Sequence, residues 1–224
     1  ARGCDGEGVT TDALLAEAVA AAKAADVVLV FAGLPDSYES EGFDRRHLDL
    51  PPGHDRLIEA LAAVHAKVVV VLLNGSAVAM PWVDRVPAIV EAWLGGQAGG
   101  GAIADVLTGR VNPSGKLSET FPVSLQQTPA WPFFPGRDGV AWYGEGPFIG
   151  YRHYDRRALQ PLFPFGHGLS YTRFDYTAIR ASAERFDVDG GGALAVEVTL
   201  RNSGARAGQE VVQLYVGERA PKVV

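Results

Sequence analysis

Short apolar runs recur through the first hundred residues of the chain. Residues 27–31, 67–73 and 88–94 are nearly uninterrupted stretches of valine, leucine, isoleucine and alanine. Runs of this length and composition are typical of strands that are buried on both faces of a parallel sheet. The first two runs are followed closely by glycine, which favours their ending there.

Helical patterns separate these runs. Residues 14–25 are rich in alanine, with Thr10 or Thr11 placed to cap a helix, and residues 54–65 carry apolar side chains at helical spacing. A third, shorter helix is expected over residues 102–107. The alternation predicts parallel βαβ units, which is an α/β fold with a mainly parallel sheet and flanking helices, an α/β sandwich.

The amino-acid composition and the pattern of apolar positions change twice after residue 111. Residues 112–164 are rich in proline, glycine and aromatic residues, which predicts a long structured excursion with little helix. Residues 194–200 and 210–216 then alternate apolar and polar positions, as the first strands of a β-sandwich would. We therefore predict two domains, an α/β domain over residues 1–173 and an incomplete β-sandwich over residues 174–224.

A charged segment, residues 38–46, directly follows the first predicted strand. It holds Glu39, Glu41 and Asp44 together with two arginines. Ligands of open α/β sheets bind just beyond the carboxyl ends of such strands. Crowded carboxylates raise one another's pKa, which suits general acid catalysis near neutral pH. The alternative is a solvated turn without chemistry.

Composition narrows the classes of function. The net charge of −6 and the absence of a basic patch argue against nucleic acid as a partner. The apolar runs are too short to cross a membrane. The single cysteine, Cys4, excludes an internal disulfide, and the five histidines lack metal-binding spacing, so we expect no metal. Residues 1–10 contain no signal peptide, which leaves a cytoplasmic or a secreted location open.

The glycine run at residues 95–101 invites a nucleotide-binding interpretation. It has no lysine followed by serine or threonine, so it fails the requirements of a phosphate loop. A flavodoxin-like nucleotide binder stays open as an alternative from the βαβ pattern alone. Residues 74–76, Asn-Gly-Ser, are expected to form a turn at a strand end.

Several segments together resemble the C-terminal part of glycoside hydrolase family 3, the β-glucosidase/β-xylosidase family. The resemblance covers nearly the whole chain. The matching segments are Ala-Arg-Gly-Cys-Asp (1–5), Glu-Gly-Phe-Asp-Arg (41–45), Val-Leu-Leu-Asn-Gly-Ser (71–76), Ala-Trp-Leu-Gly-Gly-Gln-Ala-Gly (92–99), the run 104–117, Glu-Gly-Pro-Phe-Ile-Gly-Tyr-Arg-His-Tyr-Asp (145–155) and Leu-Phe-Pro-Phe-Gly-His-Gly-Leu-Ser-Tyr-Thr (162–172).

The resemblance implies a domain arrangement and a chemistry. In this family an N-terminal β/α barrel carries an aspartate nucleophile, and the α/β sandwich domain supplies the general acid/base from a loop. A fibronectin-III-like domain often follows. Residues 1–173 would then be the α/β sandwich domain, and residues 174–224 the start of the fibronectin-III-like domain.

The resemblance also assigns roles within the charged segment. Glu41 is expected to be the general acid/base, with Glu39 as the second choice. Asp44 and Arg45 are expected to tune and orient it, and Tyr38 or Phe43 to line the sugar site. No cofactor is implied.

The function implied is that of an exo-acting retaining β-glycosidase that removes terminal β-linked sugars from a β-glycoside or oligosaccharide. The nucleophile's Ser-Asp-Trp surroundings are missing from this chain. We therefore expect it to be inactive alone and to need the barrel domain as its partner. A non-catalytic carbohydrate-binding or scaffold module is the alternative.

Overall fold

The computed structural model describes residues 1–185, 187 and 191–217 of the chain. These residues fall into two compact units. Unit 1 comprises residues 1–103 and 117–167, and unit 2 comprises residues 104–116 and 168–217.

Unit 1 is built on a parallel sheet of three strands in the order β1-β2-β3. Strand β1 (Val28–Gly33) pairs with β2 (Val68–Leu73), and β2 pairs with β3 (Ala88–Glu91). The predicted parallel sheet with flanking helices is confirmed. The expectation that all three strands are buried on both faces is wrong for β1 and β3, because alternate residues of β1 (Leu29 and Phe31) are about half exposed and no residue of β3 is fully buried. Strand β2 lies in the centre, and four of its six residues are buried, as the unbroken valine and leucine run predicts.

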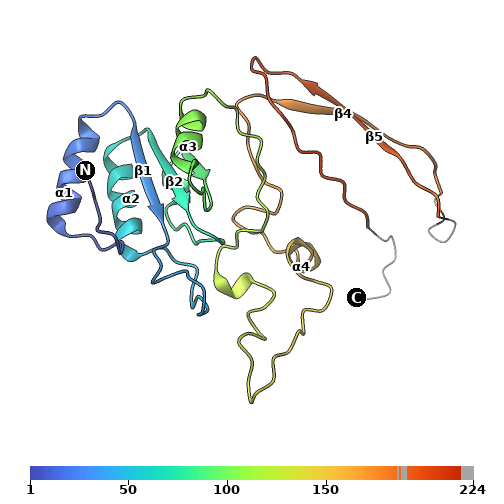
Figure 1. Ribbon diagram of the computed structural model, residues 1–224, viewed down its shortest axis with the longest axis horizontal. Coiled ribbons are helices and arrows are strands. Elements are labelled where there is room, and N and C mark those ends of the chain that lie inside the picture. Colours follow the sequence, from blue (N-terminus) through green and yellow to red (C-terminus); the bar gives the residue numbers. More distant parts are fainter. Residues whose placement is uncertain (186, 188–190, 218–224) are drawn as a thin grey trace. The chain divides into compact units, whose positions relative to one another are not determined.

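Two helices cover one face of this sheet (Figure 1). Helix α1 (Asp12–Lys23) is capped by Thr11, whose side chain accepts a hydrogen bond from the Leu14 N–H group. Helix α2 (Pro52–Val64) begins directly after Pro51. It buries Leu57, Ile58 and Leu61, which share the core with the inward-facing side chains of β1.

Four further elements of unit 1 lie within the described residues. They are the 3-10 turns η1 (Val83–Arg85) and η2 (Leu125–Gln127), the amino-terminal part of α3 (Gly99–Leu107), and α4 (Tyr151–Arg157). Helix α4 lies in the excursion where little helix was expected. It is short, it follows a glycine with a positive φ of 52° at Gly150, and it has no side-chain cap. Neither an apolar period nor a capping residue therefore signals it.

Unit 2 holds an antiparallel pair, β4 (Phe174–Ala181) and β5 (Val196–Asn202). The strand predicted over 194–200 is confirmed as β5, shifted by two residues. The strand predicted over 210–216 is wrong, because the structure has no strand there. Alternation alone does not make a strand, since a strand also needs a neighbour to pair its backbone, and β5 pairs only with β4 among the described residues.

Candidate active site

The charged segment leaves β1 at the carboxyl edge of the sheet. The Leu34 N–H group still bonds the Leu73 carbonyl of β2 at 3.1 Å, and a turn follows in which Tyr38 and Glu39 both donate to the Pro35 carbonyl. Gly42 then takes a φ of +96°, which a residue with a side chain adopts only under strain. Residues 38–46 thus lie where the fold predicts a ligand site.

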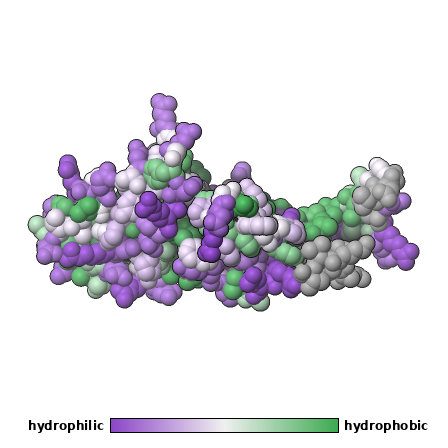
Figure 2. Space-filling model, turned by 90° about the horizontal axis from the view of Figure 1, so that it is seen from below, coloured by the Kyte–Doolittle hydropathy of each residue, from purple (hydrophilic) through white to green (hydrophobic). Residues whose placement is uncertain are grey.

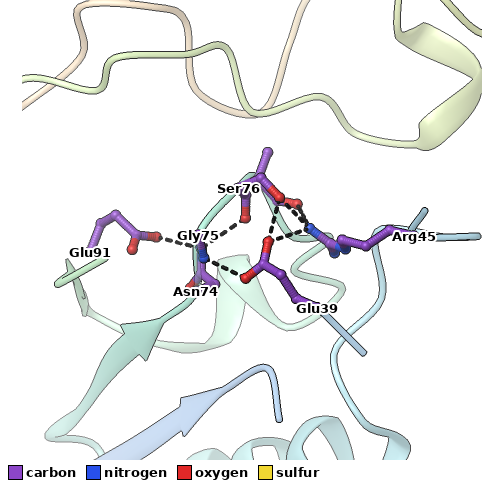
Figure 3. A network of polar contacts seen from close by, with 7 residues as sticks. Glu39, Arg45, Asn74, Gly75, Ser76 and Glu91 are labelled. Carbon is purple, nitrogen blue, oxygen red and sulfur yellow. Dashed lines mark hydrogen bonds and ion pairs between the residues drawn. The ribbon is translucent and has the colours of Figure 1, made fainter. Parts of the chain in front are cut away.

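Glu39 is tied to the end of the neighbouring strand. Its carboxylate accepts a hydrogen bond of 2.6 Å from the Gly75 N–H group and one of 2.7 Å from the Ser76 hydroxyl (Figure 3). Both of its oxygens are used in this way. Glu39 was our second choice as acid/base, and its carboxylate is held against the turn that follows β2.

Arg45 is bound to the same turn. Its Nη1 donates to the Ser76 hydroxyl at 2.7 Å and to the Ala77 carbonyl at 3.1 Å, and it lies 3.7 Å from the Glu39 carboxylate. Burial lowers the pKa of Arg45, and the negative charge of Glu39 opposes that shift. The guanidinium therefore fastens the segment to the sheet.

Two further carboxyl groups lie beside this turn. Glu91, the last residue of β3, accepts hydrogen bonds from the Trp93 N–H group at 2.9 Å and from the fully buried Asn74 amide at 3.3 Å. Burial raises the pKa of Glu91 to about 7. Burial likewise raises the pKa of Glu119, partly offset by the Ala77 N–H group and by Arg45.

Glu41 contrasts with these buried groups. It is exposed, and within the described part of the chain its carboxylate makes no hydrogen bond or ion pair. It lies two residues after Glu39 and four before Arg45, on the part of the segment between the two anchors. Its carboxylate is therefore open to solvent.

A cavity of about 860 Å³ opens beside the segment. One wall comes from residues 37–38 and 43–47, and the other from residues 125–135 of the aromatic-rich excursion. Trp131 and Phe134 contribute apolar surface, and His47 packs edge-on against Tyr38 with ring centroids 5.6 Å apart. Aromatic faces combined with charged groups fit the mixed surface of a sugar.

Seen from below, the surface of unit 1 is largely hydrophilic with small hydrophobic groups between (Figure 2).

The structure brings most of the predicted site residues together at this cavity. The four that line it are Tyr38, Phe43, Asp44 and Arg45. Glu39 and Glu41 are not among the lining residues. Glu39 is turned toward β2, and Glu41 lies at the exposed tip of the segment.

Sequence reasoning missed four residues around the turn. Asn74 and Ser76 were expected only to form a turn, and Glu91 and Glu119 were not considered. The place of Asn74 directly after β2, beside the charged segment, was a usable signal. Nothing in the sequence pointed to Glu119, because only folding brings it close to Arg45 and Ala77.

Among the described residues, no three or more histidine, cysteine, aspartate or glutamate side chains are grouped so as to hold a metal ion. No helix in the described ranges has the length and apolar character that crossing a membrane requires.

Comparison with known proteins gives consistent matches. Residues 6–171 match the Glycosyl hydrolase family 3 C-terminal domain. The thermostable beta-glucosidase B of Acetivibrio thermocellus is 58% identical over 203 residues, which cover 91% of this chain and 27% of that protein. The probable beta-glucosidase I of Emericella nidulans is 46% identical over 209 residues, which cover 92% of this chain and 25% of that protein.

Solved structures similar to this chain are also beta-glucosidases. The family 3 beta-glucosidase of Bifidobacterium adolescentis superposes with a TM-score of 0.84 at 44% identity, over 90% of this chain and 30% of that one. DesR, a beta-glucosidase from Streptomyces venezuelae solved with D-glucose, has a TM-score of 0.80 at 44% identity, over 88% of this chain and 25% of that one. The chain thus spans between a quarter and a third of these proteins. From the family match and these relatives together, this chain belongs to glycosyl hydrolase family 3 and carries that family's C-terminal domain.

Proposed function

We propose that this chain is the acid/base-bearing portion of a retaining exo-β-glycosidase that removes terminal β-linked sugars in the manner of a β-glucosidase. Support comes from relatives and structural neighbours that are β-glucosidases and match about nine-tenths of the chain. The partner would be an N-terminal β/α barrel in the same protein, and the substrate a β-glycoside or oligosaccharide.

Glu41 is the proposed general acid/base. The observation that carries this choice is the contrast with Glu39, whose two carboxylate oxygens are taken by Gly75 and Ser76, whereas the Glu41 carboxylate is exposed. A general acid must reach the glycosidic oxygen within hydrogen-bond distance. The exposed Glu41 carboxyl group is open to such an approach, whereas that of Glu39 would first have to leave Gly75 and Ser76.

The chemistry follows the retaining pathway. Glu41 protonates the oxygen of the leaving group while a nucleophile attacks the anomeric carbon, and it then removes a proton from the water that releases the sugar. The two carboxyl groups of such a site lie about 5–5.5 Å apart on opposite sides of the scissile bond. Glu39 projects from the same short loop as Glu41 and is not placed to serve as that nucleophile. An aspartate from the barrel would do so, and these 224 residues alone would be inactive.

The cavity beside the loop is the proposed place for part of the substrate. Tyr38 and Phe43 would provide ring faces for a sugar or an aromatic aglycone, and Asp44 and Arg45 would bond its hydroxyl groups or orient the loop. Residues 1–173 would form the α/β sandwich domain. Residues 174–224, of which 186, 188–190 and 218–224 lie outside the described residues, would begin a fibronectin-III-like domain.

The test compares leaving groups in the full-length protein. Aryl β-glucosides with a good leaving group need little protonation, and those with a poor one need the acid. Glu41→Ala should lower kcat/KM on the poor leaving group by roughly 100-fold or more, in line with general acid catalysis, and affect the good one far less. An equal fall on both, or none, would reject Glu41 as the acid.

The second candidate is a non-catalytic carbohydrate-binding module, which the aromatic and charged cavity also favours. It predicts that the full-length protein binds glucosides without turning any over. Calorimetric binding combined with product analysis separates the two functions.

A further inference from the structure

Glu41 lies between two residues that are fastened to one point of the sheet. Glu39, two positions before it, and Arg45, four positions after it, both bond the turn at residues 75–77 (Figure 3). The seven-residue segment from 39 to 45 is thus closed at its base. Closing a flexible segment in this way removes much of its conformational freedom, and the residues in the middle gain a defined location.

Ser76 is the centre of this attachment. Its hydroxyl donates to Glu39 at 2.7 Å and accepts from Arg45 at 2.7 Å, so a single oxygen joins the carboxylate to the guanidinium. The side chains are largely shielded from water, with 16% of Arg45 and 24% of Glu39 exposed. Charge-assisted hydrogen bonds in such surroundings are stronger than neutral ones in water.

The turn itself is held by the sheet. Asn74 follows β2 directly, is fully buried, and donates to the Ser76 carbonyl at 2.9 Å and to Glu91 at the end of β3 at 3.3 Å. The attachment point is therefore backed by two strands. Sites supported by strands are located more accurately than sites carried by loops alone.

We propose that Glu39, Arg45 and Ser76 are positioning residues that set the location of the Glu41 carboxyl group, and we name the three together the loop clamp. The proposal rests on the proposed function of Glu41 as acid/base. It gives two charged residues of the segment a use other than chemistry: Glu39 and Arg45 act through the loop and need not touch the substrate.

The kinetics of variants can distinguish a positioning role of the loop clamp from a role in folding alone. Proton transfer to the leaving oxygen depends steeply on geometry, since a misplacement of about 1 Å can cost about 100-fold in rate. Loosening the loop therefore slows the step that needs the acid. It should leave the reaction of an activated glycoside, which needs little protonation, nearly intact. A variant that is simply less folded loses both rates in equal proportion.

The experiment uses the full-length protein and the ratio of kcat/KM between an aryl glucoside with a good and one with a poor leaving group. Ser76→Ala removes the shared hydroxyl and should raise this ratio roughly 10- to 100-fold. Ser76→Thr keeps a hydroxyl and should restore a ratio close to that of the wild type. Ser203→Ala, an exposed serine of unit 2, is the matched control and should leave the ratio unchanged.

Glu39→Gln gives an independent reading, because it keeps an acceptor for Gly75 but removes the charge facing Arg45. A raised ratio is expected there as well. If Glu41→Ala raises the ratio while Ser76→Ala and Glu39→Gln leave it at the wild-type value, the loop clamp is wrong and the proposed function stands. If Glu41→Ala itself leaves the ratio unchanged, the proposed function fails and the loop clamp falls with it.

Discussion

The carboxylate of Asp55 in helix α2 accepts a hydrogen bond of 2.8 Å from the indole N–H group of Trp82, a ring with no exposed surface. Without this acceptor the indole nitrogen would be buried and unpaired, which costs free energy. The pair therefore ties α2 to the segment that precedes β3.

Substitution of Asp55 tests this tie. Asp55→Ala should lower the free energy of unfolding by roughly 1–3 kcal/mol, the cost of an unpaired buried donor. Asp55→Asn keeps an oxygen for the indole and should lose much less. Denaturant unfolding of the two variants beside the wild type measures the difference, and equal losses would show that the hydrogen bond is unimportant.

The dependence of stability on pH follows from buried carboxyl groups. Burial raises the pKa of Asp55 to about 6 and that of Glu91 to about 7. A raised folded-state pKa means that the unfolded chain releases the proton first, so stability falls as pH rises from the unfolded pKa to the folded one. The melting temperature should accordingly decline between about pH 4 and pH 7, where these shifts act.

Glu91→Gln isolates one of the two groups. The amide cannot ionise, so the upper part of the decline, toward pH 7, should flatten while the lower part due to Asp55 persists. Scanning calorimetry at half-unit steps of pH follows both. A melting temperature that still falls as steeply near pH 7 would contradict the assignment to Glu91.

Two glycines that differ in surroundings give a matched pair. At Gly53 in α2, an added Cβ would collide with the carbonyl oxygen of Gly8, which is backbone and cannot swing away. At Gly100 in α3, an added Cβ meets nothing within 4 Å.

Gly53→Ala should therefore lower the free energy of unfolding by about 1–3 kcal/mol, as overpacking does. Gly100→Ala should raise it by about 0.5–1 kcal/mol, since alanine favours a helix more than glycine does. Chemical denaturation of both variants checks the opposite signs, and a shared sign would refute the argument from contact.

A feature of the fold or of the candidate site could be predicted from the sequence when neighbouring residues alone determine it. Strands β1 and β2 were predictable because each contains an unbroken apolar run, a pattern that lies in the run itself. Burial on both faces holds for β2 alone, because Leu29 and Phe31 of β1 are 46% and 53% exposed. The place of the candidate site was inferred from the charged segment that comes directly after β1. These inferences need only neighbours in the sequence.

The polar cluster behind the site needed the fold. Its members come from four separate places in the chain, and their spacing in the sequence does not predict that they meet. They are Glu39, Ser76, Glu91 and Glu119. The same holds for the strand expected at 210–216, whose alternation was present while its partner was not. The tie of Glu39 to Gly75 is likewise invisible in sequence, and it bears on the choice between the two glutamates.

The cavity gives a prediction about substrate affinity. Trp131 lines it and is 47% exposed, whereas Trp142 is 68% exposed and is not part of the lining. Loss of a stacked ring is worth about 0.5–1.5 kcal/mol, so Trp131→Ala in the full-length protein should raise KM for an aryl glucoside about two- to tenfold. Trp142→Ala is the control, and an equal rise in both variants would place the substrate elsewhere.

The most direct test of the central claim, that Glu41 is the acid/base of a retaining glycosidase, is the product formed by Glu41→Ala in the presence of azide. Without the carboxylate, the small anion can reach the glycosyl-enzyme and attack without a general base. If Glu41 is the acid/base, azide should speed the turnover of an activated aryl β-glucoside by Glu41→Ala, and nuclear magnetic resonance should detect a glycosyl azide of retained β configuration. Turnover unaffected by azide, with glucose as the sole product, would contradict it.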